Sequence, residues 1–332
     1  MGPIRRDIVL SVVIPIYNEE EVLDPLHASL TQVLGEIGEP WEIVYVNDGS
    51  TDSTLDKLLG YQAVDPRVTV VELSRNWGHQ PAITAGLHAA RGAAVILMDG
   101  DFQDPPETLH RFVAAWRRGA QVVIAQRRSR KEHGFRTWVY PLFYKVMGFL
   151  SDFPVPLNAG IFGLLDRQAV DAINALGEGN RYLPGLRAWI GFPTEVVYYD
   201  RQDRAAGEPK QTFWRLLKYG LDAIFSFSYK PLRLSLVLGV VASALAAVIA
   251  LVSVIAMLAG ADVSIAQVTT IFAVLFLAGV QLICVGILGE YIGRVYDEVR
   301  RRPLYIVRSV HEGEVRLQVV GKDTSDRERI AA

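Results

Sequence analysis

Two long stretches without a charged residue constrain this chain more than any other feature. Residues 234–261 form an uncharged run of 28, residues 263–289 form a second run of 27, and only Asp262 lies between them. About 20 apolar residues are enough for a helix to cross a hydrocarbon core of about 30 Å. The runs therefore predict membrane helices at 232–260 and 264–290. A buried pair of helices in a water-soluble protein is the alternative.

The charges that flank this hairpin predict its orientation. Basic residues lie before the first run and after the second, whereas the short tip has none: Lys210, Arg215, Lys218, Lys230, Arg233, Arg294, Arg300, Arg301 and Arg302. Segments rich in Lys and Arg stay on the cytoplasmic side, and the first residues show no secretory signal pattern. We therefore expect an integral protein of the cytoplasmic membrane, with the domain at 1–210, the tail at 294–332 and both termini in the cytoplasm.

The segment at 211–230 has a different pattern. Its polar residues recur at helical spacing and form one narrow stripe, whereas aromatic and aliphatic residues cover the rest (the polar positions are Arg215, Lys218, Asp222 and Ser226). Such an amphipathic helix can lie in the membrane interface. Packing against the preceding domain is the alternative, and the two arrangements are compatible.

Residues 1–210 alternate between apolar runs and helical patterns. The runs lie at 8–14, 42–46, 68–73, 94–98 and 121–125, and the helical patterns at 20–34, 53–61, 80–90 and 106–116. Strands that alternate with helices indicate an α/β fold with a mostly parallel, doubly wound sheet. Ligands of such sheets bind outside the carboxyl ends of the strands. Because polar residues follow each run, we expect a site at that edge.

The strongest candidate for chemistry is the acid pair Asp99 and Asp101, which follows the fourth apolar run. Two carboxylates separated by one glycine can reach the same cation, and the glycine allows close approach. Gln103 can add a third oxygen, and ligation by oxygen alone suits Mg²⁺ or Mn²⁺. A cation held by few protein oxygens leaves room for a phosphate. An ordinary solvated loop is the alternative for an acid pair taken alone.

Several classes of site are not indicated. The chain has neither G-x-G-x-x-G after its first strand nor a G-x-x-x-x-G-K-[ST] loop. A net charge of −2 does not indicate a nucleic-acid surface. The single cysteine, Cys284, supports neither a disulfide framework nor a zinc site. This pattern favours a nucleotide whose diphosphate is bound through a metal ion.

Three segments resemble the family-two glycosyltransferases, which have the GT-A fold: VVIPIYNE at 12–19, VNDGSTD at 46–52 and MDGDFQDPPE at 98–107. Within that family, the third segment, RAAGEPK at 204–210 and the C-terminal hairpin resemble the polyprenyl-phosphate branch. That branch contains dolichol-phosphate mannose synthases and bacterial enzymes that load glucose onto undecaprenyl phosphate. The resemblance covers nearly the whole chain. It implies a Rossmann-like GT-A domain, an interfacial helix and two transmembrane helices.

The resemblance also implies roles for individual residues. The pocket for the base and ribose of the nucleotide would be lined by Pro15, Tyr17, Glu19 and Asp48. Asp99 would lie near the ribose or the metal, and Asp101 and Gln103 would be metal ligands. Arg127 resembles an arginine that meets phosphate charge, and Arg204 and Lys210 resemble the basic pair that accompanies the acceptor phosphate.

One segment departs from the family pattern. Relatives often have D-x-G-D-F-R-L where this chain has NAGIFGL at 158–164, so Ile161 replaces an aspartate. An acceptor phosphate monoester carries about −1.5 to −2 charge at neutral pH and can attack an anomeric carbon with little help from a base. Positioning and charge stabilisation are then the main requirements. We therefore expect an active enzyme, with Asn158 as a candidate contact.

These expectations combine into one function. They predict metal-dependent, inverting transfer of a hexose from a nucleotide sugar to polyprenyl phosphate, with UDP-glucose as the first donor to test and GDP-mannose as the second. The alternatives are a processive polysaccharide synthase and a catalytically silent membrane scaffold. Residues 187–189 match the Q-x-x-R-W motif of such synthases only weakly, and Ile161 is the one feature that favours a scaffold. A homo-oligomer is a further expectation. Residues 305–310 predict a strand that packs on the catalytic domain or on a neighbouring subunit.

Overall fold

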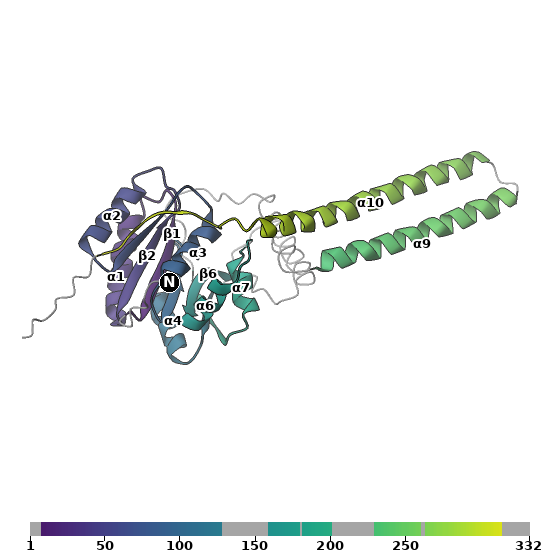
Figure 1. Ribbon diagram of the computed structural model, residues 1–332. Helices are drawn as coiled ribbons and strands as arrows, with labels where there is room; N and C mark the ends of the chain where they lie inside the picture. Colours follow the sequence, from purple (N-terminus) through teal and green to yellow (C-terminus); the bar gives the residue numbers. More distant parts are fainter. Residues whose placement is uncertain (1–7, 128–158, 180, 201–228, 260–262, 314–332) are drawn as a thin grey trace, which may run out of the picture.

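The computed structural model describes residues 8–127, 159–179, 181–200, 229–259 and 263–313 (Figure 1). Within these residues one sheet has the strand order β7-β5-β6-β4-β1-β2-β3-β8. The strands are β1 (Leu10–Ile16), β2 (Trp41–Asn47), β3 (Val68–Leu73), β4 (Ala94–Leu97), β5 (Val122–Arg127), β6 (Ala159–Asp166), β7 (Thr194–Tyr199) and β8 (Val307–His311).

The sheet is mostly parallel, as the alternating pattern predicts. β3, β2, β1 and β4 pair in parallel, and β5 pairs in parallel with β7. β6 is antiparallel to both β4 and β5, so it joins the two parallel groups. β8 pairs antiparallel with β3 at the far edge. Of the two predicted positions for the strand that follows the hairpin, the structure therefore shows packing on the α/β domain of the same chain.

Helices cover both faces of this sheet. They are α1 (Leu23–Ile37), α2 (Thr54–Val64), α3 (His79–Ala89), α4 (Thr108–Arg117), α6 (Arg167–Ala175) and α7 (Leu183–Trp189). One core lies between the sheet and α1, α2 and α4, and the other lies between the sheet and α3, α6 and α7. Successive strand residues point to opposite faces, so Val12 belongs to the first core and Val13 to the second. Two buried faces explain why the strands are continuously apolar.

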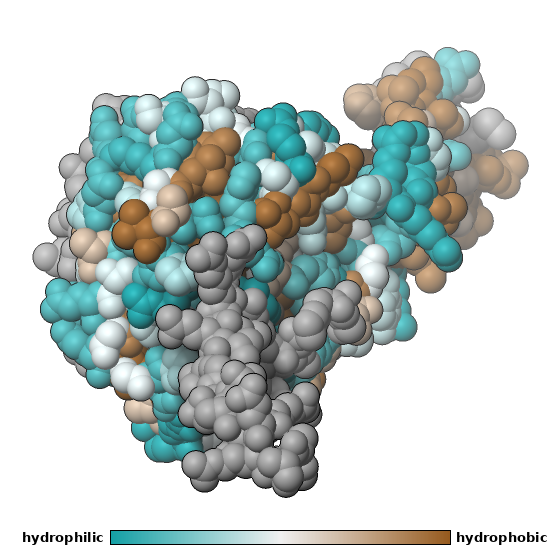
Figure 2. All heavy atoms as spheres, turned by 60° about the vertical axis from the view of Figure 1, so that its left-hand side comes forward, coloured by the Kyte–Doolittle hydropathy of each residue, from teal (hydrophilic) through white to brown (hydrophobic). Residues whose placement is uncertain are grey.

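The C-terminal hairpin consists of α9 (Lys230–Leu258) and α10 (Val263–Arg300), which extend away from the sheet (Figure 1). By length and composition both can cross a membrane, over Lys230–Ile255 and Thr269–Arg300, each with a mean hydropathy of 2.7. Almost none of either span is buried, and Figure 2 shows hydrophobic surface on the hairpin, whereas the visible face of the α/β domain is mostly hydrophilic. The structure therefore does not support a buried pair of helices.

The structure describes the end of the second predicted membrane helix but little of the predicted interfacial helix. The helix α10 continues to Arg300, beyond the boundary at 290, and its charged end contains an i,i+4 ion pair in which Arg294 lies 3.0 Å from Glu290. The predicted interfacial helix lies outside the described residues, apart from Tyr229 and Lys230 at its end. The domain boundaries stay predictions.

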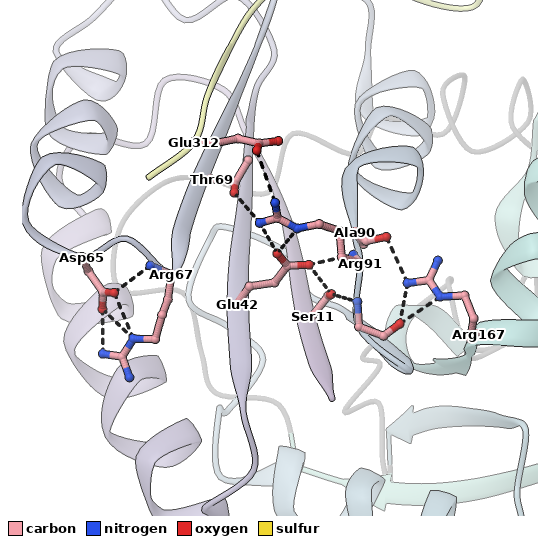
Figure 3. A network of polar contacts seen from close by, with 10 residues as sticks. Ser11, Glu42, Asp65, Arg67, Thr69, Ala90, Arg91, Arg167 and Glu312 are labelled. Carbon is pink, nitrogen blue, oxygen red and sulfur yellow. Dashed lines mark hydrogen bonds and ion pairs between the residues drawn. The ribbon is translucent and has the colours of Figure 1, made fainter. Parts of the chain in front are cut away.

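A polar network closes the edge of the sheet where the parallel strands begin (Figure 3). Glu42, at the start of β2, is 1% exposed; one of its oxygens accepts hydrogen bonds from Nε and Nη2 of Arg91, at 2.9 and 2.7 Å. Ser11 donates to the other Glu42 oxygen at 2.6 Å, and Arg91 also reaches Glu312, which follows β8, at 3.3 Å. Removing one partner of a buried ion pair leaves the other charge uncompensated, so we expect loss of Arg91 to destabilise this edge, which lies opposite the carboxyl ends of the strands.

Candidate active site

A cavity of about 380 Å³ opens at the carboxyl ends of the parallel strands, where the sequence predicts a site. It is lined by Pro15, Ile16, Tyr17, Glu19, Asp48, Asn76, Gly78, His79, Ala82, Asp99, Gly100 and Asp101. These residues come from the ends of β1, β2, β3 and β4 and from the start of α3. The structure therefore brings together Pro15, Tyr17, Glu19, Asp48 and the acid pair around one space.

Asp48 joins two strand ends. It is 4% exposed, and its two oxygens accept hydrogen bonds from the backbone N–H groups of Trp77, at 2.7 Å, and Gly78, at 2.9 Å. Burial raises the pKa of Asp48, although both donors oppose that shift by favouring the carboxylate. The next residue, Gly49, has φ +69°, and a Cβ there would lie 2.5 Å from the backbone at 75–76. Glycine at 49 thus lets the loop at 74–78 pack against Asp48.

The loops after β1 and β2 bind each other through Asn18, a residue with positive φ. The Asn18 side-chain oxygen accepts from the N–H of Thr51 at 2.8 Å, and the Asn18 N–H donates to the Ser50 hydroxyl at 3.1 Å. Ser50 therefore joins the two loops, whereas Asp52 accepts from the N–H of Thr54, at 3.1 Å, at the start of α2. These contacts hold Tyr17, which is 46% exposed, at the rim of the cavity.

The acid pair approaches the cavity from the end of β4. A Cβ at Gly100 would lie 2.3 Å from Cδ1 of Ile16 and 3.1 Å from the carbonyl oxygen of Pro15, so the glycine lets the loop after β4 lie close to the end of β1. Nε2 of His79 lies 2.9 Å from Oδ1 of Asp99. Burial lowers the pKa of His79, but the carboxylates of Asp99, Asp48 and Asp101 outweigh that effect and raise it overall.

His79 is a residue of this site that the sequence does not reveal. The sequence places His79 in a predicted loop and does not show which side chain it contacts, because its partner Asp99 is 20 residues away along the chain. One signal was available, since His79 is the first residue of α3 and α3 follows β3 at the same edge as Asp99. Asn76 and Gly78 line the cavity for the same reason.

A metal ion in this cavity would be bound by few protein side chains. Within the described residues no group of three or more His, Cys, Asp or Glu side chains is placed to hold a metal ion. Asp99 and Asp101 nonetheless both line the cavity and supply only oxygen. This donor set fits Mg²⁺ or a similar hard cation, which is often bound by one or two carboxylates together with phosphate and water. The residues thus fit a cation shared with a diphosphate.

Gln103 and Arg127 do not line the cavity. Gln103 is 5% exposed, its backbone N–H donates to Oδ1 of Asp101 at 3.2 Å, and its side-chain Nε2 has no hydrogen-bond partner among the described residues. Nε of Arg127 lies 3.4 Å from the hydroxyl of Tyr199, which donates to Asp104 at 2.7 Å. Burial raises the pKa of Tyr199 to about 12. Arg127 is thereby connected to the loop that follows the acid pair, and the ligand roles of both residues stay predictions.

The remaining candidates lie elsewhere. Asn158, Arg204 and Lys210 are outside the described residues. Ile161, at the departure from the family pattern, is 5% exposed on β6 and belongs to the core under α3, α6 and α7. Its carbonyl accepts from Nη1 of the buried Arg187 at 3.1 Å. Ile161 is therefore a packed core residue here, and it does not line the cavity.

Comparisons with known proteins define the family. Residues 11–173 match glycosyl transferase family 2, and residues 230–295 match the GtrB C-terminal hairpin. An uncharacterized glycosyltransferase of Synechocystis sp. is 44% identical over 90% of this chain and 95% of its own length. A bactoprenol glucosyl transferase derived from prophage SfII in Shigella flexneri is 36% identical over 92% of this chain and 99% of its own length. The chain belongs to glycosyl transferase family 2, and its hairpin and relatives are consistent with the polyprenyl-phosphate branch.

Solved structures show more distant likenesses. Glucosyl-3-phosphoglycerate synthase from Mycobacterium tuberculosis, in complex with Mn²⁺, UDP and phosphoglyceric acid, has a TM-score of 0.46 and 18% identity over 66% of this chain and 76% of its own. Mannosyl-3-phosphoglycerate synthase from Rubrobacter xylanophilus has a TM-score of 0.45 and 20% identity over 65% of this chain and 72% of its own.

Proposed function

We propose that this glycosyltransferase moves glucose from a nucleotide sugar, with UDP-glucose as the first choice, to a polyprenyl phosphate at the cytoplasmic face of a membrane. The observation that carries the proposal is the cavity in which Asp99 and Asp101 face the same space as Tyr17 and Asp48. Relatives named bactoprenol glucosyl transferases, which this chain matches over nearly their whole length, support glucose and the lipid acceptor.

The donor would bind with its base at Tyr17 and its diphosphate at the acid pair. An exposed tyrosine ring offers a flat apolar surface on which a base can stack. Asp99 and Asp101 would hold Mg²⁺ or Mn²⁺, which when bound supplies positive charge to the diphosphate leaving group. Glu19 and Asp48 also line the cavity. We propose that both line the ribose pocket, with Pro15 beneath the base.

The transfer itself is a displacement at the anomeric carbon. A phosphate oxygen of the acceptor forms the new bond to that carbon, and the bond to the donor diphosphate breaks, so the electron pair leaves with the nucleoside diphosphate and the configuration inverts. Because the acceptor phosphate is already anionic, the protein has to position it and to stabilise the leaving group. The packed side chain of Ile161 is compatible with such a reaction, since no general base is required there.

The acceptor side of the site includes residues outside the described part of the chain. We propose that Arg204 and Lys210 bind the acceptor phosphate, that Arg127 and Asn158 contact the reacting groups, and that the hairpin holds the domain at the bilayer. A lipid acceptor explains why a catalytic domain would carry two exposed apolar helices. The cytoplasmic orientation and a homo-oligomer belong to the same proposal.

Transfer by the purified, detergent-solubilised protein tests this proposal. We expect UDP-glucose and undecaprenyl phosphate to give a lipid phosphate that carries one hexose, in a reaction that stops with chelator and resumes with Mg²⁺ or Mn²⁺. Mass spectrometry of the lipid and a parallel reaction with GDP-mannose identify the sugar. Polymeric product would instead support a processive synthase, and the absence of both transfer and hydrolysis with every donor would support a scaffold.

A further inference from the structure

The chain returns to the catalytic sheet after it leaves the hairpin. β8 follows α10 and pairs antiparallel with β3, so that Ser309 lies opposite Glu72 and Val307 opposite Leu73 (Figure 1). β3 is the strand whose carboxyl end leads into the loop at 74–78, and Asn76 and Gly78 of that loop line the cavity. The last described strand thus pairs with the strand that leads into a loop of the candidate nucleotide site.

Two residues of this returning segment hold the first residue of the loop. The Ser74 N–H donates to the carbonyl of Ile306 at 2.9 Å, and Nη2 of Arg308 donates to the Ser74 carbonyl at 3.2 Å. Nη1 of Arg308 lies 2.8 Å from Glu72, which also accepts from the Ser309 hydroxyl at 2.7 Å. Both backbone polar groups of Ser74 are therefore bonded to the segment after the hairpin.

Further contacts lead from Ser74 to the cavity. The Ser74 hydroxyl accepts from Nε1 of Trp77 at 3.1 Å, and the N–H groups of Trp77 and Gly78 donate to Asp48. The guanidinium of Arg75 lies 4.1 Å from the centre of the Trp77 ring. A loop without regular secondary structure is thereby fixed at one end by Arg308 and at the other by Asp48.

We propose that Arg308 is a positioning residue for the nucleotide site, acting through the loop at 74–78. The inference rests on the proposed function for its ligand, but the positioning itself is a property of the free protein. Side chains that bind a ligand need such support, because small displacements of the contacting groups weaken binding. Since β8 follows α10, the segment that comes from the proposed membrane anchor completes the support of the donor site.

Hydrogen exchange and kinetics of Arg308 variants test this proposal. Arg308→Ala removes the contacts with Glu72 and with the Ser74 carbonyl. Arg308→Lys keeps a positive charge for Glu72 but lacks the second guanidinium nitrogen that donates to Ser74. Arg67→Ala is the matched control, because Arg67 makes an ion pair of similar exposure with Asp65 at the opposite end of β3. In both pairs the arginine side chain is more than half exposed and the acid is mostly buried, so the two alanine variants should unfold at nearly the same temperature.

We expect Arg308→Ala to speed exchange of the Ser74, Trp77 and Gly78 amides by about 5- to 10-fold, the effect of one lost hydrogen bond of ordinary strength. The KM for the sugar nucleotide should rise by about as much, with kcat and the KM for the lipid nearly unchanged. Arg308→Lys should fall between this variant and the wild type, and Arg67→Ala should match the wild type.

Any of three results would overturn the proposal. Exchange in the loop that equals that of Arg67→Ala would show that Arg308 does not position it. Faster exchange with an unchanged KM for the donor, or an equal loss in every kinetic parameter, would show that the loop does not serve the donor site. If the wild-type protein transfers no sugar, the proposed function fails, and the exchange measurement still decides whether Arg308 holds the loop.

Discussion

Replacing Asp101 with alanine is expected to lower the rate of sugar transfer by about a thousand-fold or more, because metal-ion stabilisation of a leaving group is worth several kcal/mol. Asp101 lines the cavity beside Asp99, and one carboxylate alone would hold the cation weakly. Initial rates with saturating UDP-glucose and undecaprenyl phosphate measure the effect. Excess Mn²⁺ should restore part of the activity if the loss comes from metal binding.

The control for this variant is Asp56→Ala. Asp56 is an exposed acid on α2 and does not line the cavity, so the same chemical change there should leave the rate nearly unaltered. An Asp101→Ala protein that kept more than about a tenth of the wild-type rate, with the same response to chelator, would remove the acid pair from the mechanism, since a tenfold change is only about 1.4 kcal/mol.

Asp48→Ala is expected to affect both stability and donor binding. The substitution leaves two part-buried backbone N–H groups in the loop at 74–78 without their acceptor, and an unsatisfied group costs up to about 1–3 kcal/mol when it is fully buried. We therefore expect a clearly lower Tm in detergent. The KM for the sugar nucleotide should rise by about 100-fold, because the loop and the Asp48 side chain both line the cavity.

Asp65→Ala is the matched control for this effect. Asp65 also accepts a backbone hydrogen bond, from the N–H of Arg67 at 2.9 Å, and it too lies next to β3, but at the end away from the cavity. Its loss should change the Tm slightly and the KM not at all. If both variants raised the KM for the donor equally, Asp48 would have only a general role in stability.

Much of the edge that carries the site was predictable from the chain. The apolar runs that precede Tyr17, Asp48 and Asp99 are strands, and parallel strands bring their carboxyl ends to one edge. The spacing of apolar residues and the polar residues that follow each apolar run are enough for such a prediction, because both patterns lie within a short stretch of sequence. The same reasoning identified the two helices that are long and apolar enough to cross a membrane.

Other features depend on contacts between distant residues. The pairing of β6 with both β4 and β5 reverses one strand within the sheet, and no local pattern at 159–166 shows that direction. The place of Ile161 in the core follows from this pairing, so its departure from the family motif could not be interpreted from the sequence. His79 becomes a site residue only when α3 lies beside the end of β4.

The most direct test is the position of a bound Mn²⁺ ion in crystals of the full chain grown with a nucleoside diphosphate. We predict an anomalous scattering peak between the carboxylates of Asp99 and Asp101 and the oxygens of the diphosphate, with the base at Tyr17. A diphosphate bound elsewhere, or one bound in this cavity while both carboxylates point away from it and from the ion, would contradict the proposed reaction.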